Sequence, residues 1–441
     1  MRIIRNAEEG RKLLLSRRPL EIEELPMDIR ETTFRTFGQE LSPEEVVRRV
    51  IRDVREDGDN AVNYYNLKFD GARTTELRVS EDEIRSAYDQ VEPEVVEALR
   101  FAAERIRQYH ELQVRGSFFD FNQNGLGQLT RPLQRVGIYA PGTRAPLPST
   151  ILMCVIPARV AGVDEVYVTS PVLPDGSVPP VKLVAADIAG ADAVFKAGGA
   201  QGVAAFAYGT ETIPRVDKIC GPGGLFVAIA KRLVYGDVGI DSIYGPTETM
   251  IIADESADPE LVAADLLAQA EHDPLASPIL LTPSHYLAEQ VARHIERLLP
   301  QMERGKIARQ ALENRGGCIL VNDIDHAIEL ANEYAPEHLC LLVEEPMAYA
   351  SKVRNAGGLF LGEASPEAIG DYTAGPSHTM PTGGSARWSS PLSVNDFVKT
   401  IAVVNLPEEL TEDLARAAAV IARAEGLTGH AHAVERRLRG R

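Results

Sequence analysis

Residues 165–196 read EVYVTSPVLPDGSVPPVKLVAADIAGADAVFK, and this stretch decides the fold class that we predict. A β-branched run at 165–169 indicates a strand, and an apolar run at 181–189, closed by Gly190, indicates a helix. A second short strand is expected at 193–196. A helix between two short strands is the unit of a parallel sheet with crossover helices.

The same alternation continues in both directions along the chain. Upstream, a strand is expected at 136–140, because Pro141-Gly142 ends an apolar run. Downstream, further strands are expected at 249–252, 278–281, 318–321 and 339–343. These strands are too many for one comfortable sheet, so we expect two α/β units with a break near Gly245.

The two ends of the chain have a different pattern. Ser42 with Glu45, and Ser80 with Glu83, have the capping-box spacing that marks helix starts in the first third. Beyond Met380 the strand pattern fades, and we interpret residues 381–384 as a linker into a helical tail.

Length and composition indicate a globular protein of two or more domains. The chain has 441 residues, 44% of them hydrophobic, and a formal net charge of −18, which argues against non-specific binding to nucleic acid. None of its four cysteines forms a C-x-x-C pair, so we expect free thiols in a reducing compartment. The first residues do not resemble a signal peptide, and no stretch approaches the ~20 apolar residues of a membrane helix. We expect a cytoplasmic protein.

The sequence lacks a complete dinucleotide-binding fingerprint. Gly221-Pro222-Gly223 begins like G-x-G-x-x-G, but Phe226 stands at the third glycine. NAD binding therefore does not follow from spacing. The glycine-rich turns at 198–201 and 221–224 each precede a helical pattern, whose free N–H groups attract phosphate, although simple tight turns explain these residues better when they are taken alone.

Two pairs of residues suggest metal and proton chemistry. Gln269 and His272, three residues apart at the end of an expected helix, can share an ion, although such an isolated pair is more often a polar helix end. Glu337 and His338 follow Pro336 at a helix-to-strand junction and offer two general bases, unless the junction is merely solvated.

Two further groups lie in regions rich in glycine. Asp371 and His378 lie in a stretch rich in glycine and proline that indicates irregular structure. Glu425 and His430 flank two glycines, which is also the pattern of a helix C-cap.

The order of these blocks resembles the histidinol dehydrogenase family over nearly the whole chain. The matching stretches are residues 137–139, 141–142, 199–201, 208–214, 221–223, 245–248, 265–272, 335–338, 370–372, 378, 392–394 and 425–430.

The resemblance implies an α/β fold of two incomplete Rossmann-like parallel-sheet domains plus small N- and C-terminal helical domains. The implied limits are a small N-terminal extension at 1–30, a substrate, zinc and catalytic domain at 31–138 and 249–385, an NAD domain at 139–248 and a C-terminal domain at 386–441. The family forms a homodimer in which the C-terminal domain is swapped onto the partner subunit, so Glu425 and His430 would act in trans.

The resemblance also implies a zinc-dependent, NAD-linked oxidation of histidinol to histidine through histidinal, in histidine biosynthesis. The implied zinc ligands are Gln269, His272, Asp371 and His430. Two neutral imidazoles, an amide and a carboxylate leave a site charge near +1, which suits an ion that orients the substrate. His338 would take the alcohol proton as hydride passes to NAD, and Glu337 would activate water for the second oxidation.

The implied contacts complete the site. Those to substrate are Thr247, Gln269, His272, Glu337, His338, Asp371, His378, Glu425 and His430, and those to the cofactor are Tyr139, Gln201 and Gly224.

The sequence departs from the family pattern at four positions, which keep two alternatives open. Gly224 replaces an asparagine, Thr143 a glycine, Thr247 a serine and Ser377 an asparagine. Losing one neutral hydrogen bond at Gly224 costs about 0.5–1.5 kcal/mol of cofactor binding. One alternative is a paralogous zinc and NAD enzyme for a different amino or sulfonated alcohol. The other is a non-catalytic zinc-binding or regulatory homologue.

Overall fold

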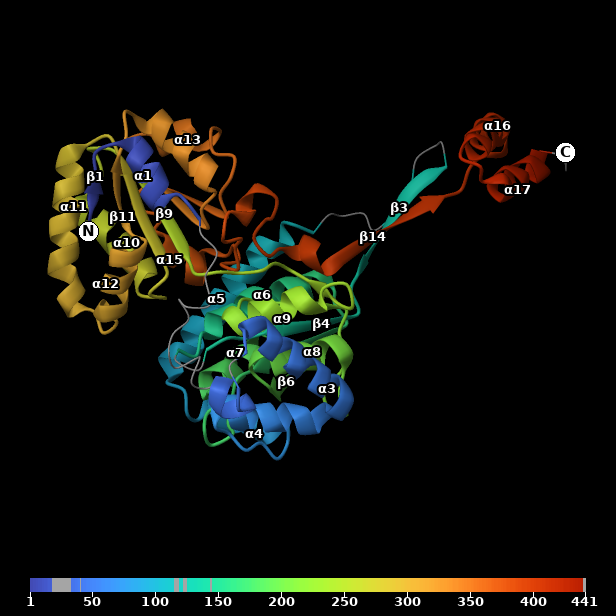
Figure 1. The fold of residues 1–441 in the computed structure, drawn as a ribbon, viewed down its shortest axis with the longest axis horizontal. Helices are drawn as coiled ribbons and strands as arrows, with labels where there is room; N and C mark the ends of the chain where they lie inside the picture. The colour runs from blue at the N-terminus through green and yellow to red at the C-terminus, as the bar shows by residue number, and fades with distance from the viewer. Residues whose placement is uncertain (18–32, 40, 115–118, 122–124, 143–144, 439–441) are drawn as a thin grey trace. The chain divides into compact units, whose positions relative to one another are not determined.

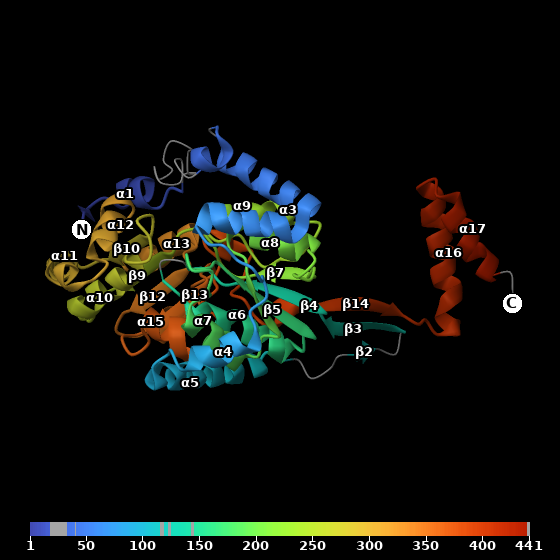
Figure 2. The ribbon, with the colours of Figure 1, turned by 90° about the horizontal axis from the view of Figure 1, so that it is seen from below.

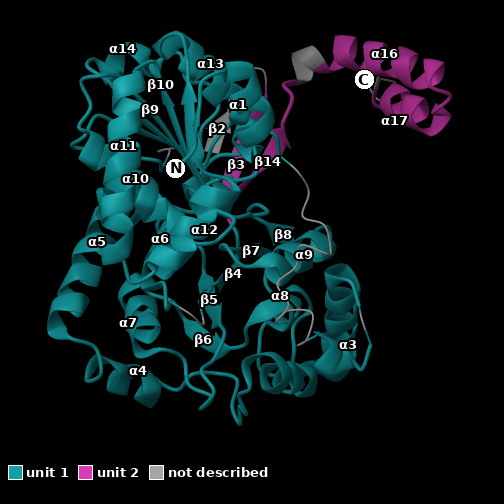
Figure 3. Ribbon diagram, turned by 60° about the vertical axis from the view of Figure 1, so that its left-hand side comes forward, with its two compact units in different colours: residues 1–114, 133–397 teal, residues 115–132, 398–441 magenta. Residues whose placement is uncertain are grey.

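The chain forms two compact units, which comprise residues 1–114 with 133–397, and residues 115–132 with 398–441 (Figures 1 and 3). This computed structural model describes residues 1–17, 33–39, 41–114, 119–121, 125–142 and 145–438. Thr143 and much of the expected N-terminal extension fall outside these ranges. No helix in the described ranges combines the length and apolar character needed to span a membrane.

The larger unit contains a five-stranded parallel sheet of order β6-β5-β4-β7-β8. Its strands are β4 (Arg135–Tyr139), β5 (Glu165–Ser170), β6 (Ala193–Lys196), β7 (Lys218–Cys220) and β8 (Gly239–Ile240). The helices around it are α3 (Pro43–Tyr65), α4 (Glu81–Tyr88), α5 (Pro93–Glu111), α6 (Pro148–Ala161), α7 (Pro180–Ala189), α8 (Gly199–Tyr208) and α9 (Leu225–Val234).

Helix α3 belongs to the core of this sheet. It lies against α8 and α9 (Figure 2), and its buried valines join Phe195 and Phe206 in one apolar cluster. Both expected capping boxes are confirmed, since Ser42 caps α3 and Ser80 caps α4 through their side-chain oxygens. The strong caps fix where each helix begins, and the buried faces fix what it packs on.

The same unit contains a six-stranded parallel sheet of order β1-β11-β10-β9-β12-β13. Its strands are β1 (Ile3–Ile4), β9 (Glu248–Ala253), β10 (Ser277–Thr282), β11 (Gly317–Leu320), β12 (His338–Leu342) and β13 (Gly358–Leu361). Its helices are α1 (Ala7–Leu14), α10 (Pro259–Ala270), α11 (His285–Leu298), α12 (Gly305–Asn314), α13 (Ile324–Tyr334), α14 (Pro346–Ala350) and α15 (Glu367–Ile369), the last continued by the π-helical turn η4 (Gly370–Ala374).

Apolar cores lie on both faces of this sheet. One core contains residues of α10, α11 and α12, and the other contains residues of α1 and α13. Every residue of β9, β10 and β12 is buried, as expected for parallel strands covered on both sides. The α/β fold class with parallel sheets and crossover helices is therefore confirmed, and the chain passes from one sheet to the other between β8 and β9.

The smaller unit corrects the expectation of a purely helical tail. It contains the antiparallel sheet β14-β3-β2, in which β14 (Val398–Val404) pairs with β3 (Leu126–Pro132), and β3 with β2 (Phe119–Phe121). Helices α16 (Glu408–Ala424) and α17 (Thr428–Leu438) follow and pack on each other. β14 was missed because five of its seven side chains are exposed, so it lacks the apolar run of the buried strands.

The expected linker at 381–384 is also wrong. Thr382 is buried and accepts a hydrogen bond from Gly245 N at 2.6 Å. Gly383 N donates to Glu248 Oε1 at 3.2 Å. This segment is therefore part of the larger unit's interior.

Gly137 in β4 tests the packing of the five-stranded sheet. A Cβ at this position would lie 2.5 Å from Phe206 Cδ2, and the Phe206 ring is fully buried. We expect Gly137→Ala to lower the free energy of unfolding by about 1–3 kcal/mol through overpacking, measured by urea denaturation. Adding Phe206→Leu should recover part of that loss, and strictly additive effects would contradict the contact.

Candidate active site

A cavity of about 250 Å³ lies between the two parallel sheets of the larger unit. Pro141 and Pro222, at its wall, follow the carboxyl ends of β4 and β7. Thr247 and Glu337, also at its wall, immediately precede the amino ends of β9 and β12. The cavity therefore joins the carboxyl edge of one sheet to the amino edge of the other.

This pocket collects most of the residues expected at the site. Its lining includes Thr247, Gln269, His272, Glu337, His338, Asp371 and His378. Glu425 and His430 belong to the smaller unit, where both are exposed.

Thr247 connects two of the pocket's polar side chains. Its hydroxyl oxygen lies 2.7 Å from Glu337 Oε2 and 3.0 Å from Gln269 Oε1. One hydroxyl has one proton, so it donates to one of these oxygens at a time. Gln269 Nε2 donates to Asp371 Oδ2 at 3.0 Å. The substitution of serine by threonine that the sequence indicated at 247 therefore keeps the functional hydroxyl.

The junction between α13 and β12 places Glu337 and His338. Ala335 has a φ of 54°, a left-handed conformation that L-residues seldom adopt, and Pro336 follows it. The chain then enters β12 at His338, which pairs in register with Thr249 of β9. His338 is therefore held by a buried strand, and Glu337 immediately precedes that strand.

His338 lies between a backbone carbonyl and a carboxylate. Its Nδ1 is 3.3 Å from Glu248 O, and its Nε2 is 3.2 Å from Asp371 Oδ1. Burial alone would lower the pKa of His338, but the carboxylates of Glu337 and Asp371 outweigh it and raise that pKa to about 10. In turn, burial opposes ionisation of Asp371, but the charge of His338 lowers its pKa.

Glu337 is the buried acid of the pocket. It accepts hydrogen bonds from Thr247 and from Glu248 N, the latter at 3.1 Å. Burial is nevertheless the dominant effect and raises the pKa of Glu337 to about 7. A carboxyl with such a pKa exchanges protons near neutral pH.

The other two histidines of the pocket favour the neutral form. Burial of the rings lowers the pKa of both His272 and His378. His378 Nδ1 donates to Asp371 O at 2.8 Å, and its Nε2 lies 3.3 Å from Thr150 Oγ1. Neutral imidazoles of this kind are able to ligate metals.

Sequence reasoning missed Glu367, a buried acid whose charge also acts on His338. Glu367 is fully buried and accepts a hydrogen bond from Thr249 Oγ1 at 2.8 Å. Its Oε1 has no partner among the described residues, and burial raises its pKa to about 8. Its position four residues before Asp371, in the same irregular stretch, was the one available signal.

The metal donors of the larger unit are an amide, an imidazole and a carboxylate. Within the described parts of the chain, no group of three or more His, Cys, Asp or Glu side chains is placed to hold a metal ion. Gln269, His272 and Asp371 nevertheless line one pocket, and amide oxygen, imidazole nitrogen and carboxylate oxygen are all zinc donors. Their chemistry fits zinc, and His430, which the sequence predicts as the fourth ligand, belongs to the smaller unit.

The three expected cofactor residues lie at the five-stranded sheet, outside the lining of this pocket. The buried Tyr139 accepts a hydrogen bond from Gly199 N at 3.0 Å. Gln201 is fully buried, and its Oε1 is unpartnered among the described residues, as is Asp70 Oδ2. Gly224 caps α9, and a Cβ there would meet no atom within 4 Å. The glycine is therefore not required by packing.

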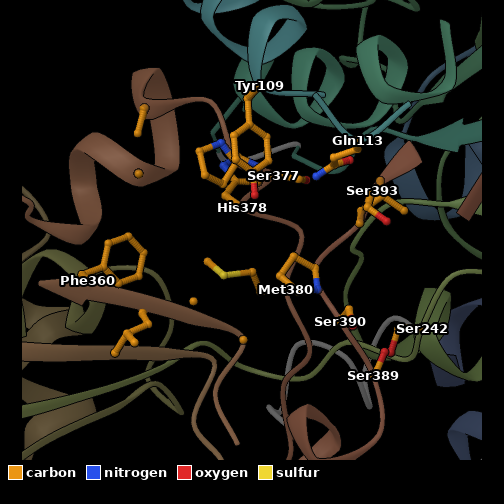
Figure 4. Close-up of a pocket in the computed structure, with 18 of the residues that line it drawn as sticks. Tyr109, Gln113, Ser242, Phe360, Ser377, His378, Met380, Ser389, Ser390 and Ser393 are labelled. Carbon is orange, nitrogen blue, oxygen red and sulfur yellow. The ribbon is translucent and has the colours of Figure 1, made fainter. Parts of the chain in front are cut away.

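A second, larger cavity of about 980 Å³ adjoins the first. The two share the lining residues Tyr244, His378 and Met380. Phe360 and Tyr109 lie at its wall (Figure 4), together with Trp388, which is 77% exposed. The catalytic pocket therefore borders a broad, partly apolar groove.

Comparison with known proteins gives one consistent result. The family model described as histidinol dehydrogenase matches residues 35–438. Histidinol dehydrogenases of Deinococcus radiodurans and Thermus thermophilus are each 52% identical, over 92% and 89% of this chain and 93% and 94% of their own lengths. The crystal structure of histidinol dehydrogenase from Elizabethkingia anophelis superposes with a TM-score of 0.90 at 36% identity, covering 100% of this chain and 98% of that one.

The buried charge of Glu337 predicts a pH-dependent stability. Its pKa is raised from 4.5 to about 7, so the folded state loses stability as pH rises between these values. In protein freed of metal by a chelator, the stability of Glu337→Gln relative to the unchanged chain should rise by about 3 kcal/mol across this window. Urea denaturation at pH 4 to 8 measures it, and a pH-independent difference would contradict the burial argument.

Proposed function

The chain belongs to the histidinol dehydrogenase family, and we propose that it performs the zinc-dependent, NAD-linked oxidation of L-histidinol through L-histidinal to L-histidine, which would complete histidine biosynthesis. The enzyme is an oxidoreductase. One observation carries the proposal: a single pocket gathers three metal donors and an adjacent glutamate–histidine pair.

The proposed zinc ligands are Gln269, His272, Asp371 and His430. When bound, zinc would orient the imidazole and amine of the substrate, and NAD would accept the hydride of each oxidation. Thr247 supports this arrangement, because its hydroxyl is within hydrogen-bonding distance of both Gln269 and Glu337. We further place His378 and Glu425 among the substrate contacts.

His338 is the proposed base of the alcohol step. Its Nε2 accepts the hydroxyl proton as the substrate carbon loses hydride, which leaves an aldehyde. A base must be neutral, and Asp371 is one of the carboxylates that favour the charged ring. If Asp371 binds the zinc, its carboxylate would favour the charged ring less, so that zinc binding would promote the neutral form of His338.

Glu337 is the proposed base of the aldehyde step. Its carboxylate takes one proton from water as the water oxygen adds to the aldehyde carbon, and the aldehyde oxygen takes up the proton that His338 accepted in the alcohol step, which gives the neutral hydrate. Loss of a second hydride and a second proton from the hydrate gives the carboxylic acid. A pKa near 7 suits this exchange, because the group both accepts and releases protons near neutrality.

The proposed cofactor contacts are Tyr139, Gln201 and Gly224. Two unpartnered buried oxygens, on Gln201 and Asp70, lie near Gly198-Gly199 at the start of α8. Buried acceptors without donors suit the hydroxyl groups of a ribose, and the helix starts suit phosphate.

We propose a homodimer in which the smaller unit of one subunit completes the other subunit's site. Exposed apolar side chains on α16 and in the turn before α17 support this: Leu414, Val420, Ile421 and Leu427 are between 46% and 69% exposed. A pair of helices is too small to form a core by itself, so such side chains need a further surface. His430, exposed on the same pair, would supply the fourth zinc ligand.

A stoichiometric assay tests the function. With excess NAD and zinc, histidinol should yield two NADH per molecule, chelation should abolish this, and added Zn²⁺ should restore it. A panel of other amino and sulfonated alcohols under the same conditions is the control. Turnover of one of these without turnover of histidinol would favour the paralogous enzyme, and no turnover with no NAD binding by calorimetry would favour a non-catalytic homologue.

Subunit mixing tests the swapped site. Asp371→Asn and His430→Ala should each be inactive alone, since each lacks one zinc ligand. If the site forms between subunits, dissociating and reassembling an equal mixture should restore about a quarter of the full activity, because half the dimers hold one intact site. Each homodimer taken through the same cycle is the control, and a mixture as inactive as its components would show that each chain builds its own site.

A further inference from the structure

We propose that Arg17 is a positioning residue for the acid–base pair of Glu337 and His338. The inference rests on the proposed function, because it assigns Arg17 to the catalytic step of that reaction. Arg17 follows α1 and lies before the residues matched by the family model.

Arg17 binds both Glu248 and the C-terminal end of α13. Its guanidinium forms a two-point ion pair with the Glu248 carboxylate, with Nη1 on Oε1 and Nη2 on Oε2, the latter at 3.0 Å. Its Nη2 also donates to Tyr334 O at 2.7 Å and to Ala335 O at 3.3 Å. The guanidinium carbon lies 4.1 Å from the centroid of the Tyr334 ring. One side chain therefore joins the start of β9 to the end of α13.

Glu248, which Arg17 binds, contacts both proposed bases, Glu337 and His338, through its backbone. Its backbone N–H donates to Glu337 Oε2 at 3.1 Å, and its backbone oxygen lies 3.3 Å from His338 Nδ1. The backbone of this one residue thus contacts the carboxylate of Glu337 through its N–H and the ring of His338 through its carbonyl oxygen. Any shift of Glu248 moves both groups relative to the reacting atoms.

Arg17 also binds the C-terminal end of α13. Ala335 is in the left-handed region and leads through Pro336 directly into Glu337. Such a conformation costs free energy and persists only when its surroundings hold it. The two carbonyl oxygens that Arg17 binds are those of Tyr334 and of Ala335 itself, and a cation at a helix C-terminus is favourable.

Arg17 is itself fixed by the sheet. β1 pairs with β11, and Leu14 and Leu15, just before Arg17, are buried in the core of the six-stranded sheet. Glu248 is 8% exposed and Arg17 26% exposed, so the pair is shielded from solvent. Lysine cannot reproduce the two-point contact, although it keeps the charge.

The test compares Arg17→Ala and Arg17→Lys with Arg11→Ala. Arg11 is the matched control, because it lies on α1 and forms an ion pair with Glu333 on the exposed surface. We expect Arg17→Ala to lower kcat roughly tenfold to a hundredfold, as small misplacements of catalytic groups do, and to leave KM for histidinol and zinc content unchanged. Arg17→Lys should lose less, millimolar guanidinium should partly rescue Arg17→Ala, and Arg11→Ala should retain full kcat.

A second variant separates positioning from folding. Glu248→Gln keeps the backbone that contacts Glu337 and His338, so adding it to Arg17→Ala should cause no further loss of kcat. Full kcat in Arg17→Ala, a change in KM or zinc content alone, or equal losses in Arg11→Ala would each overturn the proposal.

A spectroscopic measurement keeps this test independent of the reaction. The imidazole resonance of His338, assigned by its loss in His338→Asn, should shift in Arg17→Ala and stay in place in Arg11→Ala. An unmoved resonance in Arg17→Ala overturns the inference. If the unchanged chain fails to oxidise histidinol, the proposed function fails, and the resonance still decides whether Arg17 orients His338.

Discussion

The parallel pairing of β9 with β12 is the constraint on which the rest of the site depends. The register places His338 opposite Thr249, so the backbone N–H and carbonyl of Glu248 lie beside Glu337 and His338, respectively. A one-residue slip of parallel strands turns every side chain to the opposite face, which here would move the residues of the slipped strand from one apolar core of the sheet into the other. The register that packs the sheet is therefore also the register that positions Glu337 and His338.

The electrostatics of the pocket follow from that geometry. Glu337, Glu367 and Asp371 act on one imidazole, that of His338; the two glutamates are buried and Asp371 is partly buried. Burial raises the pKa of Glu337 to about 7 and that of Glu367 to about 8, so these acids keep protons that exposed ones would lose. Of these three acids, Asp371 alone has a lowered pKa, because of the neighbouring charge of His338. The pocket thus concentrates negative charge at the carboxylate proposed to bind the metal.

Short-range patterns in the sequence predicted much of this architecture, and long-range contacts could not be predicted. Buried strands such as β5 and β6, and caps such as Ser42, depend on neighbouring residues, and all are confirmed. The exposed strand β14 has no apolar run and pairs with a strand more than 250 residues earlier in the chain, so no local pattern marks it. The pocket residues were predicted from the order of sequence blocks that resembles the family, and their roles remain predictions. Arg17 escaped notice because its partners lie 231 and 317 residues away.

The division of donors between the two units has a thermodynamic consequence. The larger unit gathers Gln269, His272 and Asp371 in one pocket, and His430 is carried by the other unit, exposed at its surface. If the fourth donor comes from a partner subunit, metal binding and subunit association are linked, and each strengthens the other by the same factor. Activity would then depend on dimer formation. A free subunit would hold Glu337 and His338 in place but would lack a complete zinc site for the substrate.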